Sequence, residues 1–260
     1  MAPKYTNKLQ GKRVLVLGGT SGIGFCVAEA CVEFGAIVTV ASSREEKVNK
    51  TIERLTTSYP EAKDRIFGHL CDLASPDVEA NLTALFEFAT KDGKLDHVVN
   101  TAGDSFALVA LKDVTAETIH KTGTVRFMGM LLMAKLCPQY MHQTSESSIT
   151  STGGVNSAKP AAGWSAMAGW GAGKEGMTRG LAVDLKPIRV NCVAPGAIRT
   201  ELWDGFAPGN VQAIVDMYKS KTLLDKIGKP EDTAEAYLYM MRDAFITGTT
   251  LYTEGGYLLI

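Results

Sequence analysis

Short, continuous apolar runs alternate along this chain with longer segments that place apolar residues at helical spacing. The run RVLVLGG at 13–19 is apolar throughout and ends in glycines, which is typical of a strand buried on both faces. The same pattern predicts further strands at 36–43, 66–70, 95–103, 147–152, 188–196 and 249–256. Helical spacing predicts helices at 22–35, 45–57, 76–90, 115–141, 166–185, 211–221 and 230–242.

Regular alternation of strand and helix predicts a parallel sheet with helices on both faces, the doubly wound α/β class. No linker, repeat or low-complexity segment interrupts the 260 residues, so we expect one domain over 1–260. In such a sheet, ligands bind in the crevice at the carboxyl ends of the strands.

Composition and charge exclude several classes of function. The net charge is −1, and no block of like charges indicates nucleic acid or an anionic membrane surface as a partner. The longest apolar stretch, 128–136, is too short to span a bilayer, and the polar N-terminus lacks the apolar region of a secretory signal. The five cysteines form no C-x-x-C pair, and the four histidines have no metal-ligand spacing. We therefore expect a cytoplasmic protein with reduced thiols, no metal and a small-molecule ligand.

A glycine-rich turn joins the first strand to the first helix. Glycines there permit a sharp turn and let a diphosphate approach the backbone N–H groups at the positive end of the helix. This context favours a dinucleotide site over a plain tight turn. The turn residues expected at the cofactor are Gly18, Thr20, Ser21, Gly22, Ile23 and Gly24.

The end of the second strand indicates which dinucleotide binds. A carboxylate at this place accepts the ribose hydroxyls of NAD, but the sequence has Ser42, Ser43 and Arg44. Two hydroxyls and a guanidinium bind a 2′-phosphate, so we predict NADP(H). The alternative is that Arg44 is merely exposed in the next helix. Asp72 and Leu73, after the third strand, are expected at the adenine, although Asp72 alternatively only caps a loop.

These features resemble the short-chain dehydrogenase/reductase superfamily in order and over almost the whole chain. The residues that carry the resemblance are the glycine turn, NTAG at 100–103, ITST at 149–152, Lys174 and PGAIRT at 195–200. The resemblance implies a Rossmann-type sheet of about seven strands in the order 3-2-1-4-5-6-7 and a homodimer or homotetramer. It also implies Lys174 at the nicotinamide ribose and cofactor contacts from Asn100, Ala102, Gly103, Pro195, Gly196, Ile198 and Thr200.

The superfamily's catalytic residues are an Asn, a Ser, a Tyr and a Lys, and only Lys174 is retained here. Trp170 stands at the tyrosine position, and an indole N–H does not ionise near neutral pH. Thr152, or Ser151 one residue earlier, stands at the serine position, where a hydroxyl polarises a carbonyl. Arg126 stands where the asparagine belongs. Ordinary carbonyl reduction has therefore lost its proton donor.

This departure resembles a fungal branch, the reductase/Diels–Alderases of the malbrancheamide and paraherquamide type. The resemblance implies NADPH-dependent reduction of an iminium in indole-alkaloid biosynthesis, with or without an intramolecular Diels–Alder cyclisation. The functional residues of that branch are two Asp, an Arg and a Trp. Asp104, Arg126 and Trp164 match three of them, whereas Ala161 replaces the second Asp.

Simpler roles stay open for each of these residues. Asp104 and Arg126 are candidates for a structural ion pair, since an unpaired charge inside an apolar helix is costly. Trp164 and Trp170 are either core residues or a flat surface for an aromatic substrate. Three functions therefore remain: an imine or iminium reductase, a non-redox isomerase or cyclase that keeps NADP in its pocket, and a cofactor-binding scaffold without catalysis.

Overall fold

The computed structural model describes residues 3–104, 108–206, 209 and 211–260. Seven parallel strands form one sheet in the order β3-β2-β1-β4-β5-β6-β7, which confirms the predicted class and strand order. The strands are β1 (Arg13–Leu17), β2 (Ile37–Ser42), β3 (Ile66–Leu70), β4 (His97–Asn100), β5 (Ser148–Thr152), β6 (Arg189–Pro195) and β7 (Thr250–Thr253).

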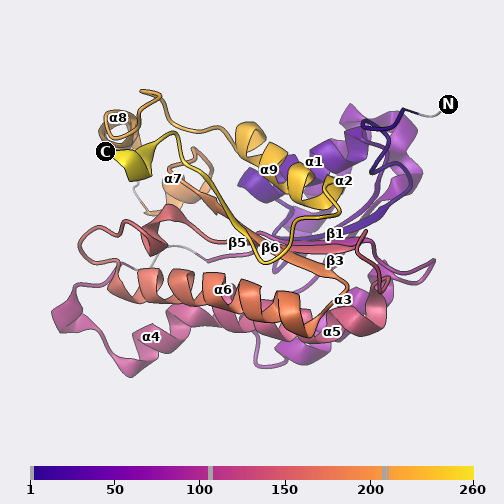
Figure 1. The fold of residues 1–260 in the computed structure, drawn as a ribbon, viewed down its shortest axis with the longest axis horizontal. Helices are drawn as coiled ribbons and strands as arrows, with labels where there is room; N and C mark the ends of the chain where they lie inside the picture. Colours follow the sequence, from indigo (N-terminus) through magenta and orange to yellow (C-terminus); the bar gives the residue numbers. More distant parts are fainter. Residues whose placement is uncertain (1–2, 105–107, 207–208, 210) are drawn as a thin grey trace.

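Helices cover both faces of this sheet, as Figure 1 shows. Helices α1 (Gly22–Glu33), α2 (Glu45–Ser58) and α9 (Pro230–Arg242) lie on one face. Helices α3 (Val78–Ala89), α5 (Gly129–Tyr140) and α6 (Ser165–Asp184) lie on the other. Short helices α4 (Ala116–Gly123), α7 (Leu202–Phe206) and α8 (Val211–Lys219) lie toward one end of the molecule.

Alternating residues of β1 enter two separate hydrophobic cores. Val14 and Val16 pack with α1 and α9, whereas Leu15 and Leu17 pack with α3 and α5. A strand buried on both faces favours apolar residues at successive positions, which explains the unbroken run of β1 in the sequence. Together the two cores fix the sheet edge from which the site is built.

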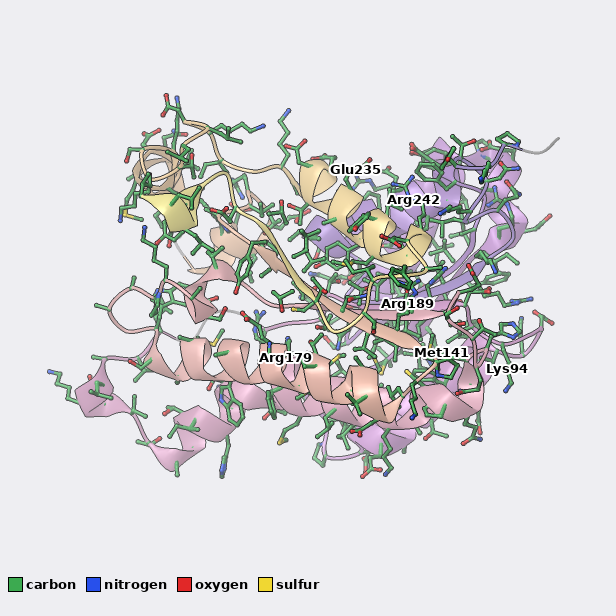
Figure 2. The ribbon with its side chains drawn as sticks, in the orientation of Figure 1. Lys94, Met141, Arg179, Arg189, Glu235 and Arg242 are labelled. Carbon is green, nitrogen blue, oxygen red and sulfur yellow. The ribbon has the colours of Figure 1, made fainter. Side chains whose placement is uncertain are left out.

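Arg189 of β6 fastens the end of α9 to the sheet (Figure 2). Its buried guanidinium donates hydrogen bonds to the carbonyl oxygens of Met240 (2.6 Å) and Met241 (3.1 Å). It also donates to the carbonyl of Ser145 at 2.6 Å, so backbone dipoles take the place of a carboxylate partner.

The long helix predicted at 115–141 is interrupted. A π-helical turn, Thr124–Met128, separates α4 from α5, and it contains Arg126. Such turns add one residue to the helix and often occur at functional sites. The pattern also failed to predict α7, whose five residues are too few to show helical periodicity.

The five cysteines are free, and four of them are buried, as expected of reduced thiols in a core. Over the described part of the chain, no helix has both the length and the apolar character needed to cross a membrane.

Candidate active site

A cavity of about 740 Å³ opens at the carboxyl ends of the strands, where the predicted site residues converge. Asn100, Lys174 and Trp170 are the predicted residues that do not line it. The predicted residues that line it are Gly18, Thr20, Ser21, Gly22, Ile23, Gly24, Ser42, Ser43, Arg44, Asp72, Leu73, Ala102, Gly103, Asp104, Arg126, Thr152, Trp164, Pro195, Gly196, Ile198 and Thr200.

The glycine turn leaves backbone N–H groups directed at the cavity. Gly18 has a φ of +78°, and a Cβ there would lie 2.6 Å from the backbone nitrogen of Ala102, so glycine is required. Ser21 is the N-cap of α1, but its side chain makes no capping hydrogen bond. Instead the N–H of Gly22 donates to the carboxylate Oε2 of Glu201 at 3.0 Å. The turn thus binds an anionic group, which is the chemistry that a dinucleotide diphosphate needs.

The end of β2 carries more positive charge than the sequence pattern suggested. Lys47, in the first turn of α2, lines the cavity together with Arg44, the N-cap residue of that helix. The neighbouring acid Glu46 pairs with Lys50 at 2.6 Å and is not among the cavity-lining residues. This corner therefore offers two cations and two serine hydroxyls to a ligand.

Asp72 lines the cavity and also performs the simpler role considered for it. Its Oδ1 accepts a hydrogen bond from the backbone N–H of Ala74 at 2.9 Å, which stabilises the turn after β3.

Thr152, rather than Ser151, reaches the cavity from the end of β5. Its Oγ1 donates to the carbonyl of Asn100 at 2.9 Å. Because this bond uses the one hydroxyl proton of Thr152, the Tyr237 hydroxyl, 2.6 Å away, donates to Oγ1. Ser151 is completely buried, 3.5 Å from the carbonyl of Asn191. The hydroxyl proton of Thr152 is therefore already used within the protein.

Lys174 lies just behind the cavity wall. It is buried, and its Nζ donates to the carbonyl oxygen of Thr152 at 2.7 Å. Burial lowers the pKa of Lys174 to about 8; the Cys192 thiol opposes this effect, and the positive charge of Arg126 adds to it. Asn100 is also buried, and its Oδ1 accepts from the N–H of Ala102 at 3.0 Å, which shapes the turn after β4.

Trp170 faces away from the cavity. Its indole Nε1–H donates to the carbonyl of Ile119 at 3.0 Å, and its ring lies 4.7 Å from that of Phe127. The ring also fills the space beside Gly123, where a Cβ would lie 2.6 Å from the indole. Trp170 thus packs α6 against α4 and the π turn.

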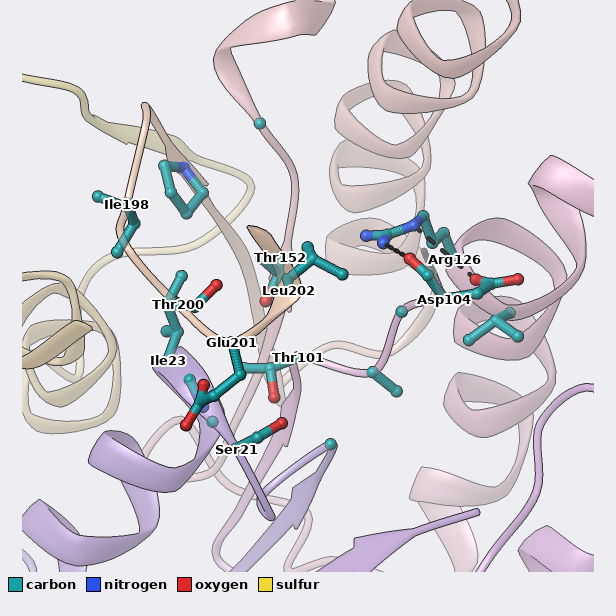
Figure 3. Close-up of a pocket in the computed structure, with 18 of the residues that line it drawn as sticks. Ser21, Ile23, Thr101, Asp104, Arg126, Thr152, Ile198, Thr200, Glu201 and Leu202 are labelled. Carbon is teal, nitrogen blue, oxygen red and sulfur yellow. Dashed lines mark hydrogen bonds and ion pairs between the residues drawn. The ribbon is translucent and has the colours of Figure 1, made fainter. Parts of the chain in front are cut away.

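Asp104 and Arg126 come together at the cavity, as predicted (Figure 3). The Nε of Arg126 lies 3.9 Å from Oδ1 of Asp104, and Nη2 donates to the backbone carbonyl of the same residue. Burial lowers the pKa of Arg126, and Asp104 opposes this shift. Gly103 lets the guanidinium approach, because a Cβ at this position would overlap it. Trp164 and Ala161 line the same cavity, and the N–H of Trp164 donates to the carbonyl of Ala161 at 3.2 Å.

Sequence reasoning missed one side of the cavity. This side is formed by the β6–α7 loop, α7, α8, the C-terminal turn and the β5–α6 loop, which contribute Glu201, Trp203, Tyr218, Tyr257, Asn156 and Lys159. Glu201 directly follows PGAIRT and Trp203 lies three residues after it, and this proximity is the signal that the sequence offered.

Comparison with known proteins agrees with this geometry. Residues 5–260 match the family model described as an SDR-like Rossmann domain. The chain is 42% identical over 265 residues to the short-chain dehydrogenase/reductase malC of Malbranchea aurantiaca, with 100% of both chains covered. It superposes on the structure of MalC reductase/Diels-Alderase from that organism with a TM-score of 0.94 at 41% identity, covering 99% of this chain and 100% of the other.

Another solved structure that matches this chain is a complex with NADP. A short-chain dehydrogenase from Burkholderia cenocepacia in complex with NADP matches with a TM-score of 0.82 at 30% identity, over 96% of this chain and 99% of that one. The fold, the nucleotide-binding turn and the full-length sequence match agree. The chain belongs to the short-chain dehydrogenase/reductase family of oxidoreductases.

Proposed function

We propose that this enzyme uses NADPH to reduce an imine or iminium bond in a small alkaloid precursor of fungal secondary metabolism. The observation that carries this proposal is the place of Trp170. The residue four positions before Lys174 is an indole whose N–H is bonded to Ile119, so it offers no acid to a reacting oxygen. Hydride addition to a cationic C=N bond gives a neutral amine, which needs no such acid.

The residues at the cavity fit a dinucleotide. The Gly22 N–H, which here holds the Glu201 carboxylate, would bind the diphosphate, and Arg44 with Lys47 would bind a 2′-phosphate. When bound, NADPH supplies the hydride. Lys174, whose Nζ donates to the carbonyl of Thr152 behind the cavity wall, would supply positive charge on the ribose side of the cleft.

The Asp104–Arg126 pair supplies charge at the substrate side. The Asp104 carboxylate is 41% exposed, so it retains the freedom to attract a cationic substrate, while Arg126 fixes its direction. Trp164 adds an aromatic surface beside the pair. An iminium ion is therefore better matched to this end of the cavity than a neutral ketone.

A coupled cyclisation is a second candidate. The resemblance to MalC reductase/Diels-Alderase favours it, and both the Thr152 hydroxyl and the Trp170 N–H are engaged inside the protein rather than offered to a substrate. Ala161 lines the cavity where the related branch has an acid, so any proton steering by that acid is absent here.

The test compares two substrates that share one carbon skeleton. A cyclic iminium ion and the corresponding ketone are offered to the enzyme with NADPH, and the loss of NADPH absorbance is followed. We expect turnover of the iminium and none of the ketone. Faster reduction of the ketone would show that the site retains an acid that we have not identified.

A further inference from the structure

Three aromatic side chains from the last third of the chain form one continuous wall of the cavity. Trp203 comes from α7, Tyr218 from α8, and Tyr257 from the C-terminal 3₁₀ turn Tyr257–Leu259. The ring centroids of Trp203 and Tyr218 lie 5.9 Å apart, and those of Tyr218 and Tyr257 lie 6.2 Å apart. Both pairs are tilted by 51°, which is within the range of favourable aromatic contacts.

The C-terminal turn is held against this wall by its backbone. Gly255 and Gly256 have φ values of +66° and +82°, which favour glycine. A Cβ on Gly256 would lie 2.7 Å from Leu223, and the N–H of Leu224 donates to the carbonyl of Gly255 at 3.2 Å. Figure 1 shows the turn lying beside α8.

Lys159, from the loop between β5 and α6, contacts Tyr257 at the cavity. Its Nζ donates to the carbonyl of Tyr257 at 2.9 Å and lies 4.7 Å from the centre of that ring. It also donates to the carbonyl of Ile260. A cation at this distance contacts one face of the phenol ring, so the ring is oriented by a charge that comes from the β5–α6 loop.

The wall is neutral and largely apolar. Trp203 is only 5% exposed although it lines the cavity. Burial and the neighbouring Tyr257 raise the pKa of Tyr218, so its phenol keeps its proton at neutral pH. Rings arranged in this way present π faces and edges, and these select flat aromatic ligands over saturated ones of equal size.

We propose that Trp203, Tyr218 and Tyr257 bind a planar aromatic ring system of the substrate, and that Lys159 is the positioning residue for Tyr257. The proposal deepens the proposed function, because it concerns the substrate of the same cavity. It does not depend on which bond is reduced.

The experiment measures binding of two neutral probes to the full-length protein by calorimetry. The probes are naphthalene-2-carboxamide and its fully saturated decahydro counterpart, which share a skeleton and an amide but differ in aromaticity. We expect the wild type to prefer the aromatic probe. Tyr257→Leu should weaken only that probe, by about 2- to 12-fold, the equivalent of about 0.5–1.5 kcal/mol for one aromatic pair.

Two further variants test the positioning role. Lys159→Met should reduce the preference for the aromatic probe, and Lys159→Arg should restore it, because a guanidinium also binds over a phenol ring. Tyr239→Leu is the matched control, since Tyr239 is 43% exposed on α9 and does not line the cavity. Circular dichroism confirms that each variant is folded.

Equal affinity of the wild type for both probes, or an equal loss of both in Tyr257→Leu, would overturn the proposal. No turnover is needed for this measurement. A failure of the reductase assay with probe selectivity intact would therefore reject the proposed function alone, and the reverse result would reject this inference alone.

Discussion

Removing the two cations at the end of β2 should abolish the preference for NADP over NAD that we propose for this site. Arg44 and Lys47 both line the cavity there, and only NADP carries the 2′-phosphate that they would bind. A hydrogen bond to a charged group contributes about 1.5–3 kcal/mol. Arg44 is exposed, so the lower limit applies, and we expect about a tenfold loss of NADP affinity for Arg44→Ala.

The double variant Arg44→Ala/Lys47→Ala should lose less than the product of the two single losses, because both side chains act on one phosphate. NAD affinity should stay within about twofold of the wild type. The loss should also shrink as salt is raised, since at physiological ionic strength exposed charges are screened over about 8 Å.

Fluorescence titration of the reduced cofactors at low and physiological salt measures all of these affinities. Lys50→Ala is the matched control: it removes one positive charge from the same helix, but Lys50 pairs with Glu46 at 2.6 Å and does not line the cavity. If Lys50→Ala lowers NADP affinity as much as Arg44→Ala does, the effect is one of general charge. If the wild type binds NAD as tightly as NADP, the 2′-phosphate assignment is wrong.

Three further predictions concern single side chains. Burial lowers the pKa of Lys174 from its ordinary 10.5 to about 8, so between these values the unfolded chain binds more protons than the folded one. The contribution of Lys174 to the free energy of unfolding should therefore rise with pH across this window, whereas the cysteine thiols, whose pKa values burial raises, contribute with the opposite sign. Chemical denaturation should show that the free energy of unfolding of the wild type, relative to that of Lys174→Met, increases with pH between these values; parallel profiles would contradict the assignment. Trp170→Phe loses one hydrogen bond, so it should lower the free energy of unfolding by about 1 kcal/mol, measured with a denaturant, and keep turnover within a few-fold. Abolished turnover would show that Trp170 takes part in the reaction. Glu201→Gln removes the carboxylate that accepts from the Gly22 N–H, so it should tighten NADPH binding several-fold in the fluorescence titration. Asp204→Asn is the control, and an equal gain in affinity for that variant would mean that net charge alone explains the effect.

The arrangement of the sheet was predictable chiefly because β1, which is buried on both faces, carries an unbroken apolar run. Val16 packs in one core, and its neighbours Leu15 and Leu17 pack in the other. Every side chain of this segment of β1 is therefore surrounded by apolar residues. The nucleotide corner was predictable for a similar reason. Gly18 and Gly22 are required by backbone geometry, and geometry of this kind leaves a direct mark on the sequence.

The direction in which a side chain points was not predictable to the same degree. Trp170 and Lys174 are one helical turn apart, yet the indole packs against Ile119 while the ammonium reaches the carbonyl of Thr152. The π turn that contains Arg126 changes the direction of the side chains that follow it in the helix. The pattern of apolar residues does not predict where a helix gains such an added residue.

The aromatic wall was missed because its members are distant in sequence. Trp203, Tyr218 and Tyr257 come from three short elements, and packing of the C-terminal turn on residues 223–224 brings Tyr257 beside the other two. Lys159, which orients Tyr257, is 98 residues away from it along the chain. Contacts of this kind depend on the completed fold.

Transfer of hydride to a C=N bond is the central claim, and isotopic labelling tests it most directly. The enzyme is incubated with a cyclic iminium substrate and NADPH that carries deuterium at the transferable position, and the product is examined by mass spectrometry and NMR. Our account predicts one deuterium at the carbon that formed the C=N bond, and no product when NADPH is replaced by NADP⁺. Unlabelled product, or turnover with NADP⁺ alone, would contradict it and assign the site to isomerisation or cyclisation.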